Sequence, residues 1–202
     1  MKTFLHVGPG GKSKHQTTNE FASDHWKEIR LDINPRVEAD FHGSIKDMSD
    51  IPSSSMDALY SSHNIEHIYY HEVPKALSEF FRVLKQKGFV VLTCPDLQSV
   101  SEEIAKGNLI GELYSSPAGP ISALDVVYGH VASVRQGESY MAHRCGFTQK
   151  SLVKNFLEVG FKNTASMRRK KPYFDLWIVA SKFNASQEEL KALATKHFPQ
   201  SS

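Results

Sequence analysis

The segment Lys2-Thr-Phe-Leu-His-Val-Gly-Pro-Gly-Gly11 joins a short apolar run to a glycine-rich turn, and it constrains the fold more than any other stretch of the 202-residue chain. A second short run, Glu28–Asp32, ends in an acid. A strand that stops at glycines brings backbone N–H groups close to a ligand, because no Cβ intervenes. An acid at the tip of the neighbouring strand can accept hydrogen bonds from both hydroxyls of a ribose. Together the two segments predict a site for a nucleoside-bearing cofactor, although the turn lacks the full Gly-x-Gly-x-x-Gly pattern of a dinucleotide site.

The composition fits one globular domain spanning residues 1–202. Apolar residues make up 40% of the chain and charged residues 23%, as is usual for such proteins, and the length allows a full hydrophobic core. A net charge of +2 gives no reason to expect nucleic acid as a partner, and no apolar run approaches the roughly 20 residues of a membrane span. Cys94 and Cys145 form no Cys-x-x-Cys pair, which predicts neither a disulfide framework nor a zinc ribbon. The N-terminus has no signal-peptide layout, so we expect a cytoplasmic protein with no membrane partner.

Strand-like and helix-like segments alternate along the chain, which predicts an α/β fold. Two amphipathic segments are predicted to be helices: Glu72–Leu84, closed by basic residues and a glycine stop at Gly88, and Gln149–Val159, capped by Thr148. The continuous, β-branched run Phe89–Thr93 is typical of a strand buried on both faces of a parallel sheet. The other predicted strands are Thr3–Val7, Ile29–Ile33, Ala39–His42, Met56–Ser61, Phe161–Ser166 and Tyr173–Ser181.

Other segments depart from this alternation. Residues 12–25 are polar and lack helical periodicity, so the first helix is expected to be short or missing. Residues 97–143 form a long insert after the fifth strand, rich in Gly, Ser and Pro; loops of this length are usually functional, and we expect a substrate lid. Residues 185–202 are expected to form a terminal helix or tail. The basic run Arg168–Lys171 is interpreted as a solvated turn.

Several motifs, in matching order and spacing, resemble the class I S-adenosylmethionine-dependent methyltransferases, and in particular their type 11-like group. The matching segments are Val7-Gly-Pro-Gly10, the acid Asp32, Met56–His67, Ala76–Gly88 and the strand Phe89–Thr93. The resemblance covers residues 3–96 well and residues 144–181 more loosely. It implies a Rossmann-like fold, with a seven-stranded, mostly parallel sheet flanked by helices and the ligand over the carboxyl ends of the strands.

The resemblance also implies S-adenosylmethionine as the cofactor and S-adenosylhomocysteine as its product. The glycine turn would close on the methionine part, Asp32 would hold the ribose, and Ile33 would pack beside the adenine. The loop after the third strand would border the adenine ring, with Ser44 where many relatives have an acid. Ser62 and His63 would face the methyl-sulfonium end. The cofactor-binding residues expected on this basis are Val7, Gly8, Gly10, Asp32, Ile33, Ser44, Ile45, Ser62 and His63.

Methyl transfer is an in-line displacement at a sulfonium carbon, in which the protein aligns the acceptor and excludes water. His63 is the candidate catalytic base, because an imidazole titrates near neutral pH, although it could instead pack against the cofactor. On a continuous helix, His63, Glu66, His67 and His71 would share one face and could gather a divalent metal. We prefer a structural interpretation, in which Glu66 and His67 tie a turn to neighbouring backbone, and we expect no metal.

The insert should define the methyl acceptor, an unidentified small-molecule or glycan-like compound that reacts through oxygen or nitrogen. Five residues in or beside the insert are chemically able to contact such an acceptor: Asp96, His130, Tyr140, His143 and Arg144. Two other functions share the glycine turn and the acid. An NAD-dependent oxidoreductase is disfavoured because the Gly-x-Gly-x-x-Gly helix opening is missing. A catalytically degenerate binding or assembly protein would suit the missing first helix.

Overall fold

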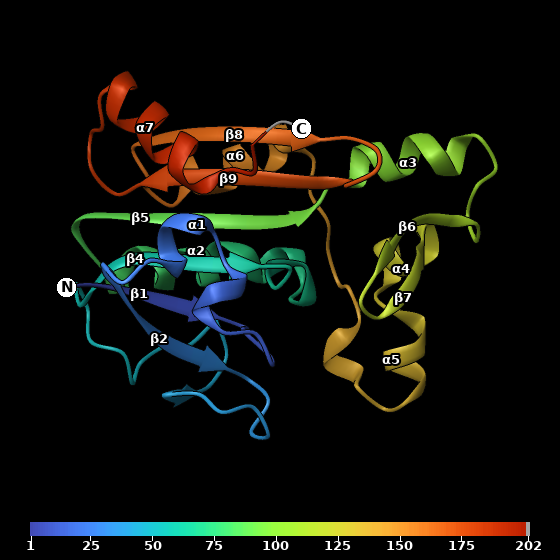
Figure 1. Cartoon of the computed structure of the whole chain (residues 1–202), viewed down its shortest axis with the longest axis horizontal. Helices are drawn as coiled ribbons and strands as arrows, with labels where there is room; N and C mark the ends of the chain where they lie inside the picture. The colour runs from blue at the N-terminus through green and yellow to red at the C-terminus, as the bar shows by residue number, and fades with distance from the viewer. Residues whose placement is uncertain (201–202) are drawn as a thin grey trace.

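A central sheet of seven strands organises the computed structural model, which describes residues 1–200 (Figure 1). The strand order is β3-β2-β1-β4-β5-β9-β8. Within this sheet, β9 runs antiparallel to the other six strands, which are parallel to one another. The fold is therefore the mostly parallel, Rossmann-like α/β architecture that the sequence predicts. The strands are β1 (Lys2–Val7), β2 (Trp26–Asp32), β3 (Phe41–His42), β4 (Met56–Ser62), β5 (Leu84–Pro95), β8 (Asn163–Arg169) and β9 (Asp175–Ser181).

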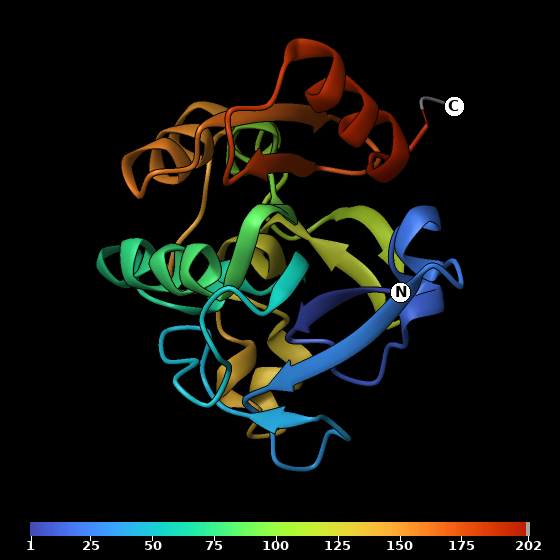
Figure 2. The same cartoon turned by 90° about the vertical axis from the view of Figure 1, so that its left-hand side faces the viewer.

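Helices cover both faces of this sheet, with α2 and α6 on one side and α1 and α7 on the other (Figure 2). Three further α-helices belong to the insert, and short 3-10 turns join several elements. The α-helices are α1 (Asn19–Ala22), α2 (Val73–Val83), α3 (Leu97–Ala105), α4 (Ala123–Tyr128), α5 (Val131–Arg135), α6 (Gln149–Glu158) and α7 (Gln187–His197). The 3-10 turns are η1 (Lys14–Gln16), η2 (Ile65–His67), η3 (Tyr70–Glu72) and η4 (Ser139–Met141).

The first helix is reduced to one turn, as the polar sequence before Trp26 predicts. Phe21, from α1, stacks on Phe4 of β1 with ring centroids 4.4 Å apart, and full burial of such a side chain contributes roughly 2 kcal/mol. Leu190 and Leu193 of α7 pack against the same cluster. The C-terminal helix thus covers sheet surface that a longer first helix would otherwise bury. Residues 201 and 202 of the predicted terminal segment lie outside the described residues.

The helix α2 ends differently from the prediction. Its C-cap is Leu84, which has extended backbone and pairs with Met56, so the chain enters β5 directly. Gly88 lies four residues further on and does not cap the helix. A Cβ on Gly88 would come within 2.9 Å of both Leu84 Cβ and the Lys85 carbonyl oxygen. The predicted glycine stop was wrong because the glycine meets a steric need inside the strand entry.

The insert between β5 and α6 is folded rather than irregular. It contains α3, a hairpin of β6 (Glu112–Ser116) and β7 (Gly119–Ser122), and then α4, α5 and η4. Its small core includes the side chains of Val100, Leu113, Ile121, Val126 and Phe174. Figure 1 shows this unit beyond the carboxyl ends of β1 and β5. Among the described residues, no helix has the length and apolar character needed to cross a membrane.

Candidate functional site

A pocket of about 440 Å³ opens at the carboxyl ends of β1, β2 and β4. Open α/β sheets bind ligands at this end of the strands. Eight of the nine residues expected to bind the cofactor line the pocket: Gly8, Gly10, Asp32, Ile33, Ser44, Ile45, Ser62 and His63. The ninth, Val7, is fully buried at the end of β1, beneath the glycine turn. The structure therefore brings the predicted residues together at one site.

The glycine turn needs its glycines for two different reasons. Gly8 and Gly10 both have left-handed backbone, with φ of +63° and +54°. A Cβ on Gly8 would lie 1.8 Å from Nδ2 of Asn64, so this glycine permits close approach of the loop after β4. A Cβ on Gly10 would meet no atom within 4 Å, because it would point into open space. Since Gly10 also lines the pocket, its bare α-carbon leaves that room to a ligand.

Asp32 is held in place by backbone N–H groups before any ligand arrives. Its Oδ2 accepts a hydrogen bond from the Gly10 N–H at 2.9 Å, and its Oδ1 accepts one from the Asn34 N–H at 2.8 Å. Arg30 donates to the Gly10 carbonyl oxygen at 2.8 Å and so ties the turn to β2. Each carboxylate oxygen keeps acceptor capacity for a second donor. A pair of ligand hydroxyls could therefore bind an acid whose position is already fixed.

The pocket lining also includes apolar side chains next to polar groups. Ile33 is 58% exposed although it is a large aliphatic residue, and the buried Ile45 lines the pocket as well. Lys46, another lining residue, donates to Glu72 at 2.6 Å, and this hydrogen bond lowers the pKa of the Glu72 carboxyl. An exposed isoleucine in a pocket suits a flat, apolar ring system.

His63 occupies a strained position at the pocket wall. Its φ is +49°, which is uncommon for any residue other than glycine, and its backbone N–H donates to the Thr93 carbonyl oxygen at 2.9 Å. The side chain is 45% exposed, and Nδ1 lies 3.4 Å from Oε1 of Glu66. Such strain is concentrated at functional sites because the surrounding structure must hold it. The imidazole is thus placed between the pocket and a buried acid.

Glu66 is a buried carboxylate without a hydrogen bond. It is 1% exposed, and neither side-chain oxygen has a hydrogen-bond partner in the described part of the chain. Burial alone would raise the pKa of Glu66, but His63, His67 and His143 lower it below the ordinary value. The carboxylate is therefore charged at neutral pH, inside a ring of imidazoles.

The helix that would align His63, Glu66, His67 and His71 does not form. Two separate 3-10 turns replace it, and His71 is exposed and stacks on Tyr69 with centroids 5.7 Å apart. The residue that joins Glu66 and His67 is instead His143, at the end of the insert. The sequence places His143 far from this pair, so helical spacing could not reveal the contact.

A second cavity, of about 290 Å³, lies under the insert and adjoins the first. Glu66, Pro95, Tyr128 and His143 are among its lining residues, and Arg144 lines both cavities. The Arg144 guanidinium also sits 4.8 Å from the ring centroid of Tyr69. Tyr140 lines the first pocket, where its hydroxyl accepts a hydrogen bond from Asn34 Nδ2 at 3.2 Å. Tyr140, His143 and Arg144 are thus gathered around the two cavities.

The remaining two predicted acceptor contacts lie elsewhere. His130 is the N-cap residue of α5, pairs with Ser133 Oγ at 2.9 Å, and lines neither cavity. Asp96 is fully buried and caps α3 by accepting from the Gln98 N–H at 3.1 Å. Its other oxygen accepts from Arg168, a residue of β8. The basic run is therefore not a solvated turn at its start, because Arg168 pairs with a buried acid.

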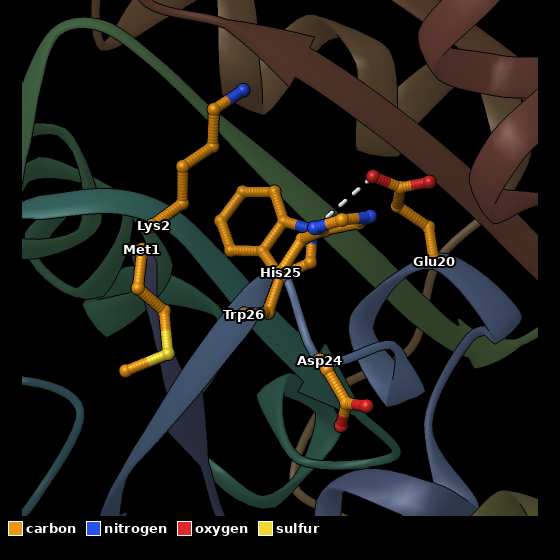
Figure 3. Close-up of a pocket in the computed structure, with 6 residues that line it drawn as sticks. All are labelled: Met1, Lys2, Glu20, Asp24, His25 and Trp26. Atoms are coloured by element: carbon orange, nitrogen blue, oxygen red, sulfur yellow. Dashed lines mark hydrogen bonds between the residues drawn. The ribbon is translucent and has the colours of Figure 1, made fainter.

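A further pocket lies at the opposite, amino-terminal ends of β1 and β2 (Figure 3). Trp26 forms its floor and donates through Nε1 to Glu20 Oε1 at 3.2 Å, while Lys2 and Met1 flank it. This pocket is wide open to solvent and far from the glycine turn along the strands. It contains none of the residues that the sequence predicts to be functional.

Known proteins are similar to the chain over residues 5–92 in sequence and over most of its length in fold. A family model described as a methyltransferase domain matches residues 5–92, which contain every residue expected to bind the cofactor. No curated protein is significantly similar in sequence to the chain. The solved structure of a SAM-dependent methyltransferase from Archaeoglobus fulgidus has 13% identity and a TM-score of 0.57, covering 90% of this chain and 86% of that one.

Another similar structure carries a ligand of direct interest. It is the 1,6-didemethyltoxoflavin-N1-methyltransferase of Burkholderia thailandensis, with 1,6-didemethyltoxoflavin and S-adenosylhomocysteine bound. It has 14% identity and a TM-score of 0.56, covering 90% of this chain and 71% of that one. At such identities the solved structures show the fold alone, and the family model matches residues 5–92. In sheet order and in the sequence of residues 5–92, the chain is therefore similar to the S-adenosylmethionine-dependent methyltransferases.

Proposed function

We propose that the chain transfers a methyl group from S-adenosylmethionine in the first pocket to a small acceptor in the cavity beneath the insert. The observation that carries this proposal is the junction of the two cavities, where Arg144 lines both and His63 faces Glu66. A methyl donor in one chamber and an acceptor in the other could meet at that junction. In-line displacement requires this kind of arrangement, with the reacting atoms held close and water excluded.

The cofactor would lie along the first pocket in one orientation. Gly8 and Gly10, with Val7 beneath them, would leave room for its methionine part, and Asp32 would accept hydrogen bonds from the ribose hydroxyls. The adenine would cover the exposed side chain of Ile33. Its other neighbours would be Ser44 and Ile45, and the methyl-sulfonium end would lie near Ser62 and His63. The prior fixing of Asp32 supports this orientation, because a preorganised acceptor binds without further ordering cost.

The acceptor would be a small molecule or the terminal unit of a glycan, methylated at oxygen or nitrogen. A cavity of about 290 Å³ is at the small end of ligand sites. Tyr140, His143 and Arg144 would contact the acceptor, and His63 would either accept its proton or position it. Asp96 and His130 are left out of this set because their side chains are engaged in capping and pairing within the fold.

Residues 97–143 would act as the substrate lid. The insert closes one side of the first pocket through Tyr140, whose hydroxyl bonds to Asn34 just after β2. A solvent-exposed hydrogen bond such as this one can break and reform at little cost. Cofactor binding beside Asn34 would therefore be coupled to the position of the insert.

Calorimetric titration tests the cofactor half of the proposal. We expect one equivalent of S-adenosylmethionine or S-adenosylhomocysteine to bind and NAD to give no heat. Substitution His63→Asn tests the second half, because a base or positioning group should lower turnover when cofactor and acceptor are both saturating. Binding of NAD instead, or of none of the three compounds, would contradict the proposal.

A further inference from the structure

Three side chains from two distant segments converge beside the proposed methyl-transfer junction. Glu66 and His67 come from η2, and His143 comes from the end of the insert. One ligand atom from each side chain lies within 4.8 Å of those from the other two. Ligands of one divalent ion lie about 3.4 Å apart when bonds are about 2.1 Å, so small rotations of the side chains would close the site.

Both imidazoles have a backbone carbonyl beside Nδ1, the kind of second-shell partner that ligating histidines commonly have. Nδ1 of His143 lies 2.7 Å from the Val126 carbonyl oxygen, and Nδ1 of His67 lies 3.2 Å from that of Ala142. A carbonyl oxygen can only accept, so Nδ1 carries the proton in each ring. In the neutral imidazole, Nε2 then keeps a free lone pair for a metal, and a ligating histidine commonly donates its other ring N–H to a carboxylate, a backbone carbonyl or water.

The third side chain of the group, Glu66, would supply a negatively charged ligand to a metal ion. Glu66 is 1% exposed and lines the second cavity, and its two oxygens have no hydrogen-bond partner among the described residues. A buried carboxylate that accepts no hydrogen bond costs free energy. His63 Nδ1, at 3.4 Å, lies beyond the usual hydrogen-bond distance, so a cation bound here would stabilise the carboxylate further. The backbone carbonyl of Glu66 accepts from the Arg144 N–H at 2.8 Å, which holds η2 against the returning insert.

We propose that Glu66, His67 and His143 bind one divalent transition-metal ion. Two imidazoles and one carboxylate favour Zn²⁺, Fe²⁺, Co²⁺ or Ni²⁺ over Mg²⁺ or Ca²⁺, which prefer oxygen ligands. Three protein ligands leave at least one coordination position open, as in catalytic sites. His63 stands beside this group, with Nδ1 3.4 Å from Oε1 of Glu66, but is not part of it.

The location suggests what the open position would hold. His67 lines the cofactor pocket, whereas Glu66 and His143 line the cavity beneath the insert. An ion between them would bind an oxygen of the acceptor and fix it facing the methyl donor. This role, unlike metal binding itself, rests on the proposed function. It narrows the acceptor to compounds that present a hydroxyl, phenol or carboxylate oxygen at the junction.

Titration of the full chain with Zn²⁺ and Co²⁺, after removal of metal with a chelator, tests the site. We expect one equivalent of each ion to bind, and Co²⁺ to give visible absorption bands typical of nitrogen and oxygen ligands. Glu66→Gln and His143→Asn should each weaken Zn²⁺ binding at least ~10-fold, the lower end of what loss of even a supporting residue costs. His71→Asn, in the same segment but outside the cluster, should bind Zn²⁺ like the wild type.

Binding of S-adenosylhomocysteine, measured on each protein, separates the two proposals and reports on folding. Retained binding of the cofactor product by His143→Asn shows that a loss of Zn²⁺ binding does not come from unfolding. The metal site is overturned if the wild type shows no saturable Zn²⁺ binding, or if either cluster variant binds Zn²⁺ as tightly as His71→Asn does. Zn²⁺ binding in a wild type that binds no S-adenosylhomocysteine would instead overturn the proposed function and leave the metal site standing.

Discussion

The Gly10 N–H donates a hydrogen bond to Oδ2 of Asp32 at 2.9 Å, so the glycine turn after β1 and the acid at the end of β2 form one unit. Asp32 therefore holds the glycine turn in place in addition to offering its oxygens to a ligand. Removing its charge should therefore affect both the pocket wall and the ligand contact. This relationship makes Asp32 the most sensitive residue of the proposed cofactor site.

Asp32→Asn should weaken S-adenosylhomocysteine binding by about 10- to 100-fold. Hydrogen bonds to a charged acceptor contribute roughly 1.5–3 kcal/mol, and the amide can offer only one oxygen. Calorimetry at fixed salt measures the change. Asp50→Asn, an exposed acid away from the pocket, is the matched control and should bind like the wild type. Equal affinity in both variants would remove Asp32 from the cofactor site.

Gly10→Ala should abolish cofactor binding with only a modest loss of stability. Left-handed backbone costs an alanine about 1–2 kcal/mol, but no protein atom lies within 4 Å of the new Cβ, which would occupy ligand space. Gly107→Ala is the control, since its φ is +87° and its Cβ also meets nothing. It should lower the melting temperature similarly and keep S-adenosylhomocysteine binding. If Gly10→Ala binds the ligand normally, the turn does not contact it.

Asp96→Asn should destabilise the fold without affecting cofactor binding. The substitution removes the charge of the buried Asp96 and leaves the half-buried Arg168 with only Glu102 as an acidic partner, at a cost of about 2 kcal/mol, below that of breaking a fully buried pair. Denaturant unfolding at neutral pH measures the loss. A variant of unchanged stability but with an increased KM for the acceptor would show that Asp96 contacts the acceptor after all.

Stability should fall in mild acid because of His197. This side chain is 2% exposed and stacks on Phe21 with centroids 4.4 Å apart, and burial lowers its pKa from 6.5 to about 4. Below pH 6.5 His197 is protonated in the unfolded chain, whereas in the folded chain it stays neutral until about pH 4. The free energy of unfolding should therefore drop by about 3 kcal/mol across that range and be unaffected by this group above it.

His197→Phe should remove this part of the acid sensitivity, because a phenyl ring suits the aromatic cluster and does not titrate. Denaturant unfolding of the wild type and of His197→Phe at pH 7.5, 5.5 and 4.5 gives the slope of the free energy of unfolding against pH for each protein. As a control, the His15→Gln variant, changed at an exposed histidine, should show the same dependence of unfolding free energy on pH as the wild type. Identical slopes for the wild type and His197→Phe would assign the acid sensitivity to other groups.

The sequence predicts that the residues of the proposed cofactor site lie together, because their placement depends on local rules. A glycine turn and an acid that end adjacent parallel strands must meet at one edge of the sheet, which is where Gly8, Gly10 and Asp32 lie. The short first helix also follows from local polarity. These features require only that strands be recognised and paired in order.

The acceptor side depends on contacts that local patterns do not encode. His143 reaches Glu66 through the folding of the whole insert, and Arg168 reaches Asp96 because β8 enters the sheet beside β9. The continuous helix that would place His63 and His71 on one face does not form, since His63 has left-handed backbone and two separate 3-10 turns occupy the segment. A buried acid between histidines became visible only in three dimensions.

Transfer of labelled methyl from S-adenosylmethionine to a metabolite extract, by the wild type and by Asp32→Asn, tests the central claim most directly. We predict that the wild type labels at least one small acceptor, that S-adenosylhomocysteine inhibits the transfer, and that Asp32→Asn is strongly impaired at subsaturating cofactor. A wild-type protein that binds S-adenosylhomocysteine but labels nothing, or an Asp32→Asn variant with undiminished transfer at low cofactor, would contradict the account.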